Sequence, residues 1–76
     1  MEKETFIVSC INEDKEIVEV KPFDSFMDAF EYMSSCYRRE SKYFEHGDIF
    51  TKAAHATNED ETIGYWWSID KITINF

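Results

Sequence analysis

The chain has 76 residues, which suits one domain with one small hydrophobic core. A hydrophobic content of 43%, thirteen aromatic residues, and only two glycines and one proline argue against disorder. Sixteen acidic residues against eight basic ones give a formal net charge of −8, which disfavours direct binding to nucleic acid or to an anionic membrane surface.

Two β-rich runs at the start of the chain predict a hairpin. Residues 5–11 (TFIVSCI) and 16–21 (EIVEVK) are rich in β-branched residues, and a polar segment separates them. A five-residue connection, 12–16, sets Ile11 opposite Ile17, and a slip of one residue would turn the second strand over. In this register one face carries Phe6, Val8, Cys10, Val18 and Val20.

An amphipathic helix is expected after Pro22, which ends the second strand. Ser25 and Asp28 fit a capping box with Ser25 as the N-cap. Acidic residues come early in this segment and basic ones late, which favours the helix dipole. Gly47 is the expected stop. The apolar stripe that defines the helix consists of Phe26, Ala29, Phe30, Met33, Cys36 and Tyr37.

Residues 48–57 (DIFTKAAHAT) are compatible with a strand or a helix. The adjacent alanines favour a helix, whereas the polar tip and strand that follow favour a hairpin. Folding back around 58–61 sets Ala54 opposite Tyr65, a small residue against a large ring. We therefore expect a strand.

The segment that contains GYWW alternates clearly over 62–69. One face receives Ile63, Tyr65, Trp67 and Ile69, and the other receives Gly64, Trp66, Ser68 and Asp70. The apolar phase then shifts to Ile72, Ile74 and Phe76. This shift predicts a bulge or bend at Asp70–Lys71, with a separate last strand as the alternative.

The predicted order is therefore β-β-α-β-β over a single domain, residues 1–76. We expect an α+β fold, a small single-layer antiparallel sheet with one amphipathic helix packed on one face. The tripeptide NED occurs at 12–14 and 58–60, once at each predicted hairpin tip, which indicates two similar turns.

Trp66 is the aromatic residue that alternation turns away from the helix. Three isoleucines of the first hairpin are also expected on uncovered faces. Such an apolar patch is typical of interaction surfaces, although these side chains or nearby loops can also cover one another. The leading interpretation is a non-enzymatic protein-binding module that engages a partner protein or forms a homodimer. Its candidate residues are Trp66, Ile7, Ile11 and Ile17.

The acidic hairpin tips support a second interpretation. Their carboxylates could imitate the charge spacing of a nucleic-acid backbone, as in inhibitors of nucleic-acid-binding proteins of the phage anti-defence type. Polar residues are also the default at hairpin tips. The residues concerned are Glu13, Asp14, Glu16, Glu59, Asp60 and Glu61.

No catalytic, cofactor or metal site is expected. The two histidines and two cysteines lack ligand spacing, and the isolated glycines form no phosphate loop. A Cys36–His55 dyad is conceivable, but the helix stripe uses Cys36 for packing. The cluster Arg38, Arg39 and Lys42 is explained by its place at a helix C-terminus.

The expected compartment is the cytoplasm. The N-terminal MEKETF is charged where a signal peptide would be apolar, and no apolar run reaches membrane-spanning length. Cys10 and Cys36 are too few for a disulfide framework, so we expect two reduced thiols.

Overall fold

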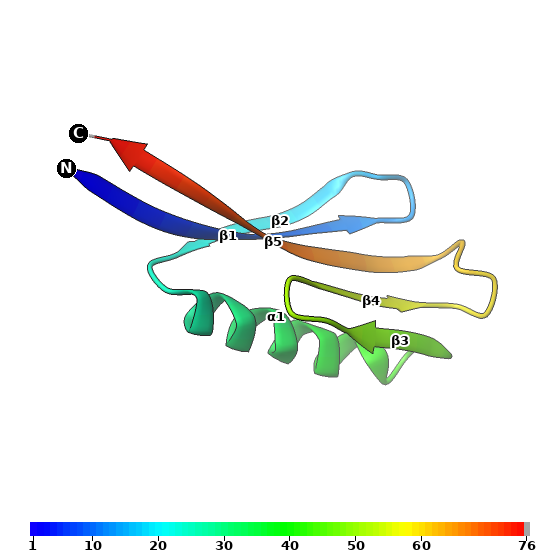
Figure 1. Cartoon of the computed structure of the whole chain (residues 1–76). Coiled ribbons are helices and arrows are strands. Elements are labelled where there is room, and N and C mark those ends of the chain that lie inside the picture. Colours follow the sequence, from blue (N-terminus) through cyan, green and yellow to red (C-terminus); the bar gives the residue numbers. More distant parts are fainter. Residues whose placement is uncertain (76) are drawn as a thin grey trace.

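The computed structural model describes residues 1–75, so the prediction for Phe76 lies outside the described residues. The elements are β1 (Glu2–Asn12), β2 (Ile17–Phe23), α1 (Phe26–Ser41), β3 (His46–Ile49), β4 (Ala53–Thr57) and β5 (Gly64–Asn75). They form one antiparallel sheet in the order β2-β1-β5-β4-β3, with α1 lying on one face (Figure 1). The predicted α+β class is confirmed, with β3 as an additional strand.

Helix α1 begins as predicted but ends earlier. Ser25 is the N-cap, and its Oγ accepts a hydrogen bond from the backbone N–H of Asp28 at 3.1 Å. The helix ends at Ser41, so the prediction that Gly47 stops it is wrong. Gly47 instead lies in β3, where a Cβ would come within 3.0 Å of a backbone oxygen and 3.1 Å of the Tyr37 ring. The glycine serves this close approach.

Residues 48–57 do not form one strand. Asp48 and Ile49 belong to β3, and a tight turn closed by a hydrogen bond from the Phe50 N–H to the Ala53 oxygen leads into β4. Ala54 pairs with Trp67 and not, as predicted, with Tyr65. Because this error is two residues, every side chain keeps its predicted face.

The first hairpin is confirmed, but its register is not. Ile11 pairs with Ile17 as predicted, and then a bulge at Val18 shifts the remainder of β2 by one residue. Val20 consequently pairs with Ser9, lies 54% exposed and does not share the face of Val8. The prediction that Val18 and Val20 continue the core face is therefore wrong.

The residues at the end of β2 explain this shift of register. The shifted register turns Phe23 toward the helix, where its ring centroid lies 5.3 Å from that of Tyr32. The Tyr32 hydroxyl donates a hydrogen bond to the Glu19 carboxylate. An aromatic contact on the core side thus replaces the predicted burial of Val18 and Val20, both of which are exposed.

Strand β5 has no bulge at Asp70–Lys71 and is not divided, so the predictions of a bulge and of a separate last strand are wrong. Its pairing with β1 is continuous from Tyr65 with Asn12 to Asn75 with Glu2. Ile72 and Ile74 therefore lie on the face opposite to that of Trp67.

Strands β1 and β5 extend beyond the other strands of the sheet. β2 pairs with β1 only from Phe6 onward, and β4 pairs with β5 only as far as Ser68. Residues 2–5 and 72–75 therefore form a two-stranded ribbon, the terminal arm, which extends away from the helix (Figure 1).

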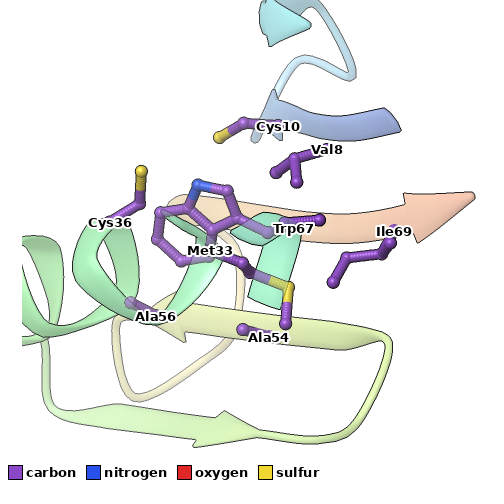
Figure 2. Close-up of a cluster of buried hydrophobic side chains, with 9 residues drawn as sticks. Val8, Cys10, Met33, Cys36, Ala54, Ala56, Trp67 and Ile69 are labelled. Atoms are coloured by element: carbon purple, nitrogen blue, oxygen red, sulfur yellow. The ribbon is translucent and has the colours of Figure 1, made fainter. Parts of the chain in front are cut away.

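The core lies between α1 and the covered face of the sheet. Figure 2 shows the Trp67 indole between β1 and the side chains of Met33 and Cys36 on α1. Trp67 is 4% exposed. The buried hydrophobic residues are Val8, Cys10, Ala29, Met33, Cys36, Ala54, Ala56, Trp67 and Ile69.

Candidate functional site

Trp66 lies on the face of the sheet that α1 leaves uncovered, which we call the open face. It pairs with Ile11 of β1 on one side and with His55 of β4 on the other. Ile11 in turn pairs with Ile17 of β2, which is 69% exposed. These four residues form one row across four strands, and neighbours cover part of the indole.

Ile7 is on the same face but not in this row. It pairs with Pro22 and Asp70, and Ser9 separates it from Ile11 along the strand. The structure thus brings together three of the four predicted apolar residues, Ile11, Ile17 and Trp66, and sets Ile7 apart.

A groove of about 470 Å³ lies beside this row, at the end of the sheet where both long hairpins turn. Trp66 and Ile11 form its apolar part. The polar residues that line it are Asn12, Glu13, Lys15, Glu61 and Thr62. The acidic tips of two hairpins that are distant in sequence therefore meet at one site.

The two tips use similar turns, each closed by a hydrogen bond from the N–H of the third residue after an asparagine to the backbone oxygen of that asparagine. Asn12 Oδ1 accepts hydrogen bonds from the N–H groups of Asp14 and Glu16, both at 3.0 Å. In the second tip, Asn58 Oδ1 accepts from the N–H groups of Thr62 and Ile63 at 2.9 and 3.1 Å. The repeated NED therefore marks two similar turns, as predicted.

Each turn contains a residue with a left-handed backbone three positions after its asparagine. Lys15 has φ +62° and Glu61 has φ +58°, a conformation that is uncommon for residues other than glycine. These are the only such non-glycine residues in the described part of the chain, and both line the groove. Sequence reasoning did not identify Lys15 as a site residue; the equal spacing after NED was the available signal.

The predicted acidic residues do not all lie in the groove. Glu13 and Glu61 line it, whereas Asp14, Glu16, Glu59 and Asp60 are exposed elsewhere on the same two tips. The two tips together contain these six acidic residues and only one basic residue, Lys15. Their charge makes this end of the sheet strongly negative.

The two cysteines belong to the core. Cys10 and Cys36 are buried free thiols, and burial is the main cause that raises the pKa of Cys10 to about 12. A neutral thiol with so high a pKa is a poor nucleophile. Cys36 lies on the helix side and His55 on the open face, so the sheet separates the two members of the conceivable dyad.

Within residues 1–75, no three histidine, cysteine or acidic side chains gather as ligands for a metal ion. Helix α1, the one helix of these residues, lacks the length and apolar character needed to cross a membrane. No family model, curated protein or solved structure matches this chain.

Proposed function

We propose that this protein binds another protein through the groove between its two hairpin tips, with Trp66 as the central contact. The observation that carries the proposal is the composition of this groove, a tryptophan and an isoleucine bordered by carboxylates. Tryptophan is enriched among the residues that dominate binding energy, especially where surrounding groups exclude water. The two free buried thiols suit a reducing compartment, so we place this activity in the cytoplasm.

Charge defines the partner further. With Glu13 and Glu61 at the groove and four more acids on the same tips, the complementary segment carries lysine or arginine. The apolar part of the groove takes a hydrophobic side chain. We therefore expect the partner to present an apolar residue flanked by basic ones.

The backbone at Lys15 and Glu61 supports a role for these side chains. Glycine adopts a positive φ at no steric cost, so glycine is the residue that favours stability at both positions. Unfavourable backbone conformations that persist tend to occur at functional sites. The presence of charged side chains here is explained if they contact a ligand.

Peptide selection tests this proposal. A displayed library of random dodecapeptides is selected on the immobilised protein, and each enriched peptide is then measured against Trp66→Ala. We expect enriched peptides with an apolar residue between basic ones, and at least a tenfold loss of affinity with the variant. Tyr43→Ala is the matched control, because Tyr43 is an exposed aromatic residue away from the groove.

Two further variants refine the test. Glu61→Gly should weaken peptide binding while leaving thermal stability unchanged or higher, which separates a contact role from a structural one. Ile7→Lys should have little effect, because Ile7 does not line the groove. Peptides that bind wild type and Trp66→Ala equally would rule the groove out.

The meeting of both acidic tips favours one alternative function, imitation of a nucleic-acid backbone to block a nucleic-acid-binding protein. Its contacts would be the six tip carboxylates and not the indole. Binding to a basic target would then fall steeply, by about 10³-fold or more, between 50 and 200 mM salt. Binding that changes little with salt but is lost in Trp66→Ala excludes the alternative.

A further inference from the structure

The strand edges of this sheet are protected unequally. An exposed edge offers unpaired N–H and C=O groups to another chain, and proteins usually blunt it with prolines, bulges, charges or short strands. Edge strand β2 has Pro22 and the bulge at Val18, and edge strand β3 has only four residues. The free edge of β1 in the terminal arm carries Glu2 and Glu4.

The free edge of β5 carries two charged residues at its start, Asp70 and Lys71, but none of these devices along the terminal arm, residues 72–75. It begins after Ile69, whose N–H still donates to the oxygen of Lys52 at 2.9 Å. Beyond that point no strand within residues 1–75 pairs with β5 on this side. The same stretch carries Ile72 and Ile74, which are 48% and 46% exposed.

The direction of the backbone groups follows from this hydrogen bond. In an antiparallel sheet, the N–H and C=O of one residue point to the same side and alternate along the strand. The N–H and C=O of Ile69 point toward the β4 side of β5. The backbone groups of Lys71, Thr73 and Asn75 therefore point to the same side. These three residues therefore present unpaired backbone groups along the free edge.

We propose that this edge pairs antiparallel with the same edge of a second copy of the chain, with Thr73 opposite the second copy's Thr73. A pairing of this kind is isologous, so it closes as a two-fold dimer. In this register all three outward residues are used, because Lys71 meets Asn75 on both sides of the axis. A register centred on Ile72 uses only Lys71 and Thr73 in mutual pairs, because Asn75 would then meet Ile69, which is already bonded to Lys52. A register centred on Ile74 pairs only Thr73 with Asn75.

The side chains agree with this register. Ile72 falls opposite Ile74 of the second copy, as a non-hydrogen-bonded pair in which side chains lie close together. Both pairs lie on the open face of the arm, where the isoleucines are exposed in the single chain. The partner covers this surface.

Charge explains why a second copy fits although the chain is acidic. Residues 2–5 and 70–75, which comprise the terminal arm and the two residues of β5 before it, contain three acids and two lysines, so this end of the sheet carries little of the net charge of −8. The strongly acidic tips lie at the other end of β1 and β5. Pairing through the arms keeps the two acidic ends far apart.

Disulfide trapping tests the register. Hydrogen-bonded antiparallel pairs have Cα atoms about 5.5 Å apart, which is within the range of a disulfide. Thr73→Cys should form a covalent dimer under mild oxidation at least tenfold faster than Glu4→Cys. Glu4 is the matched control because it pairs with Thr73 within the same arm and is similarly exposed, but lies on the other strand. Equal rates would overturn the proposal.

Proline substitution tests the edge without a covalent trap. The N–H of Thr73 and that of Glu4 both point out of the arm, on opposite edges, so proline removes no ladder hydrogen bond at either position. Sedimentation of the wild type from 10 μM to 1 mM should show a rise from the monomer mass toward twice that mass, as expected for a small interface. Thr73→Pro should abolish the rise and Glu4→Pro should not.

A wild type that remains monomeric at 1 mM, or a dimer equally sensitive to both prolines, would contradict this pairing. The test is independent of the proposed binding groove. Trp66→Ala should leave this dimer intact, and Thr73→Pro should leave peptide binding intact.

Discussion

Thr57 carries a buried hydroxyl that has no hydrogen-bond partner. The residue is fully buried in β4, and its Oγ1 is the unsatisfied side-chain atom of the described residues. It pairs with Gly64, where a Cβ would lie 2.2 Å from the Ala56 oxygen and 2.8 Å from the Thr57 Cα. The hydroxyl is thus buried at a point where the two strands approach each other closely.

Thr57→Val should therefore raise the free energy of unfolding. An unsatisfied buried polar group costs about 1–3 kcal/mol, and valine has nearly the same shape without the hydroxyl. We expect a gain of about 1 kcal/mol in urea unfolding. Thr57→Ser is the control, because it keeps the hydroxyl, loses a methyl group and should be destabilising. A valine variant less stable than wild type would show that the hydroxyl has a partner.

The Cys10 thiol should make the protein less stable at alkaline pH. Its folded pKa of about 12 exceeds the ordinary value of 9.0, mainly because burial disfavours the thiolate. Above pH 9 the unfolded chain releases this proton and the folded chain keeps it. The stabilising difference is complete below pH 9 and is lost as the pH rises toward 12, at up to about 1.4 kcal/mol per pH unit.

The measurement is urea unfolding between pH 8 and 11. Cys10→Ala should flatten the decline, whereas Val8→Ala, a cavity in the same core that removes no ionisable group, should keep it. The decline should not vanish in Cys10→Ala, because the hydrogen bond to Glu19 also raises the pKa of Tyr32. An unchanged slope in Cys10→Ala would contradict the burial argument.

Among the elements, the helix shows what local sequence determines. Its start and its buried stripe follow from a cap and a period that lie within sixteen residues. Its end was not predictable in the same way, because Gly47 reads as a stop but serves the packing of Tyr37 on β3. A glycine does not indicate which of its uses applies.

The strands show where alternation misleads. Val18 and Val20 alternate as if β2 were regular, yet the contact between Phe23 and Tyr32 favours the shifted register. The phase change in β5 suggested a bulge only on the assumption that all apolar residues face the helix. The strand simply extends beyond the helix, and its last isoleucines face the other way.

The groove at Trp66 was predictable only in part, because its residues come from strands whose order the sequence does not show. The position of Trp66 follows from parity within one strand, which a sequence displays directly. That Lys15 and Glu61 border one groove depends on β1 lying beside β5, a pairing between the two ends of the chain. Local patterns contain no information on that strand order.

At the scale of the whole molecule, the two surfaces lie at opposite ends of an elongated body. The described residues extend over 46 × 22 × 15 Å, with the terminal arm at one end of β1 and β5 and the acidic tips at the other. A dimer through the arms would thus direct both grooves away from the interface. Such an arrangement would let one dimer engage two partner segments at once.

The uneven charge should make stability depend on salt. The chain has sixteen acidic residues and only eight basic ones. Three ion pairs occur among residues 1–75, all between at least partly exposed side chains: Lys3–Asp24, Arg39–Glu40 and Lys71–Glu4. Exposed pairs contribute little, so repulsion among the remaining carboxylates should dominate.

Raising NaCl from 10 to 300 mM should therefore raise the melting temperature by a few degrees, because the screening length falls from about 30 Å to below 8 Å. The measurement is thermal unfolding at a few micromolar protein, where the arms remain unpaired. Neutralising the second tip with Glu59→Gln and Asp60→Asn should reduce this increase, since both residues lie in the acidic cluster. Glu4→Gln, which removes an acid already paired with Lys71, should not reduce it. A melting temperature that falls with salt would mean that the ion pairs outweigh the repulsion, and that the acidic end costs the folded chain nothing.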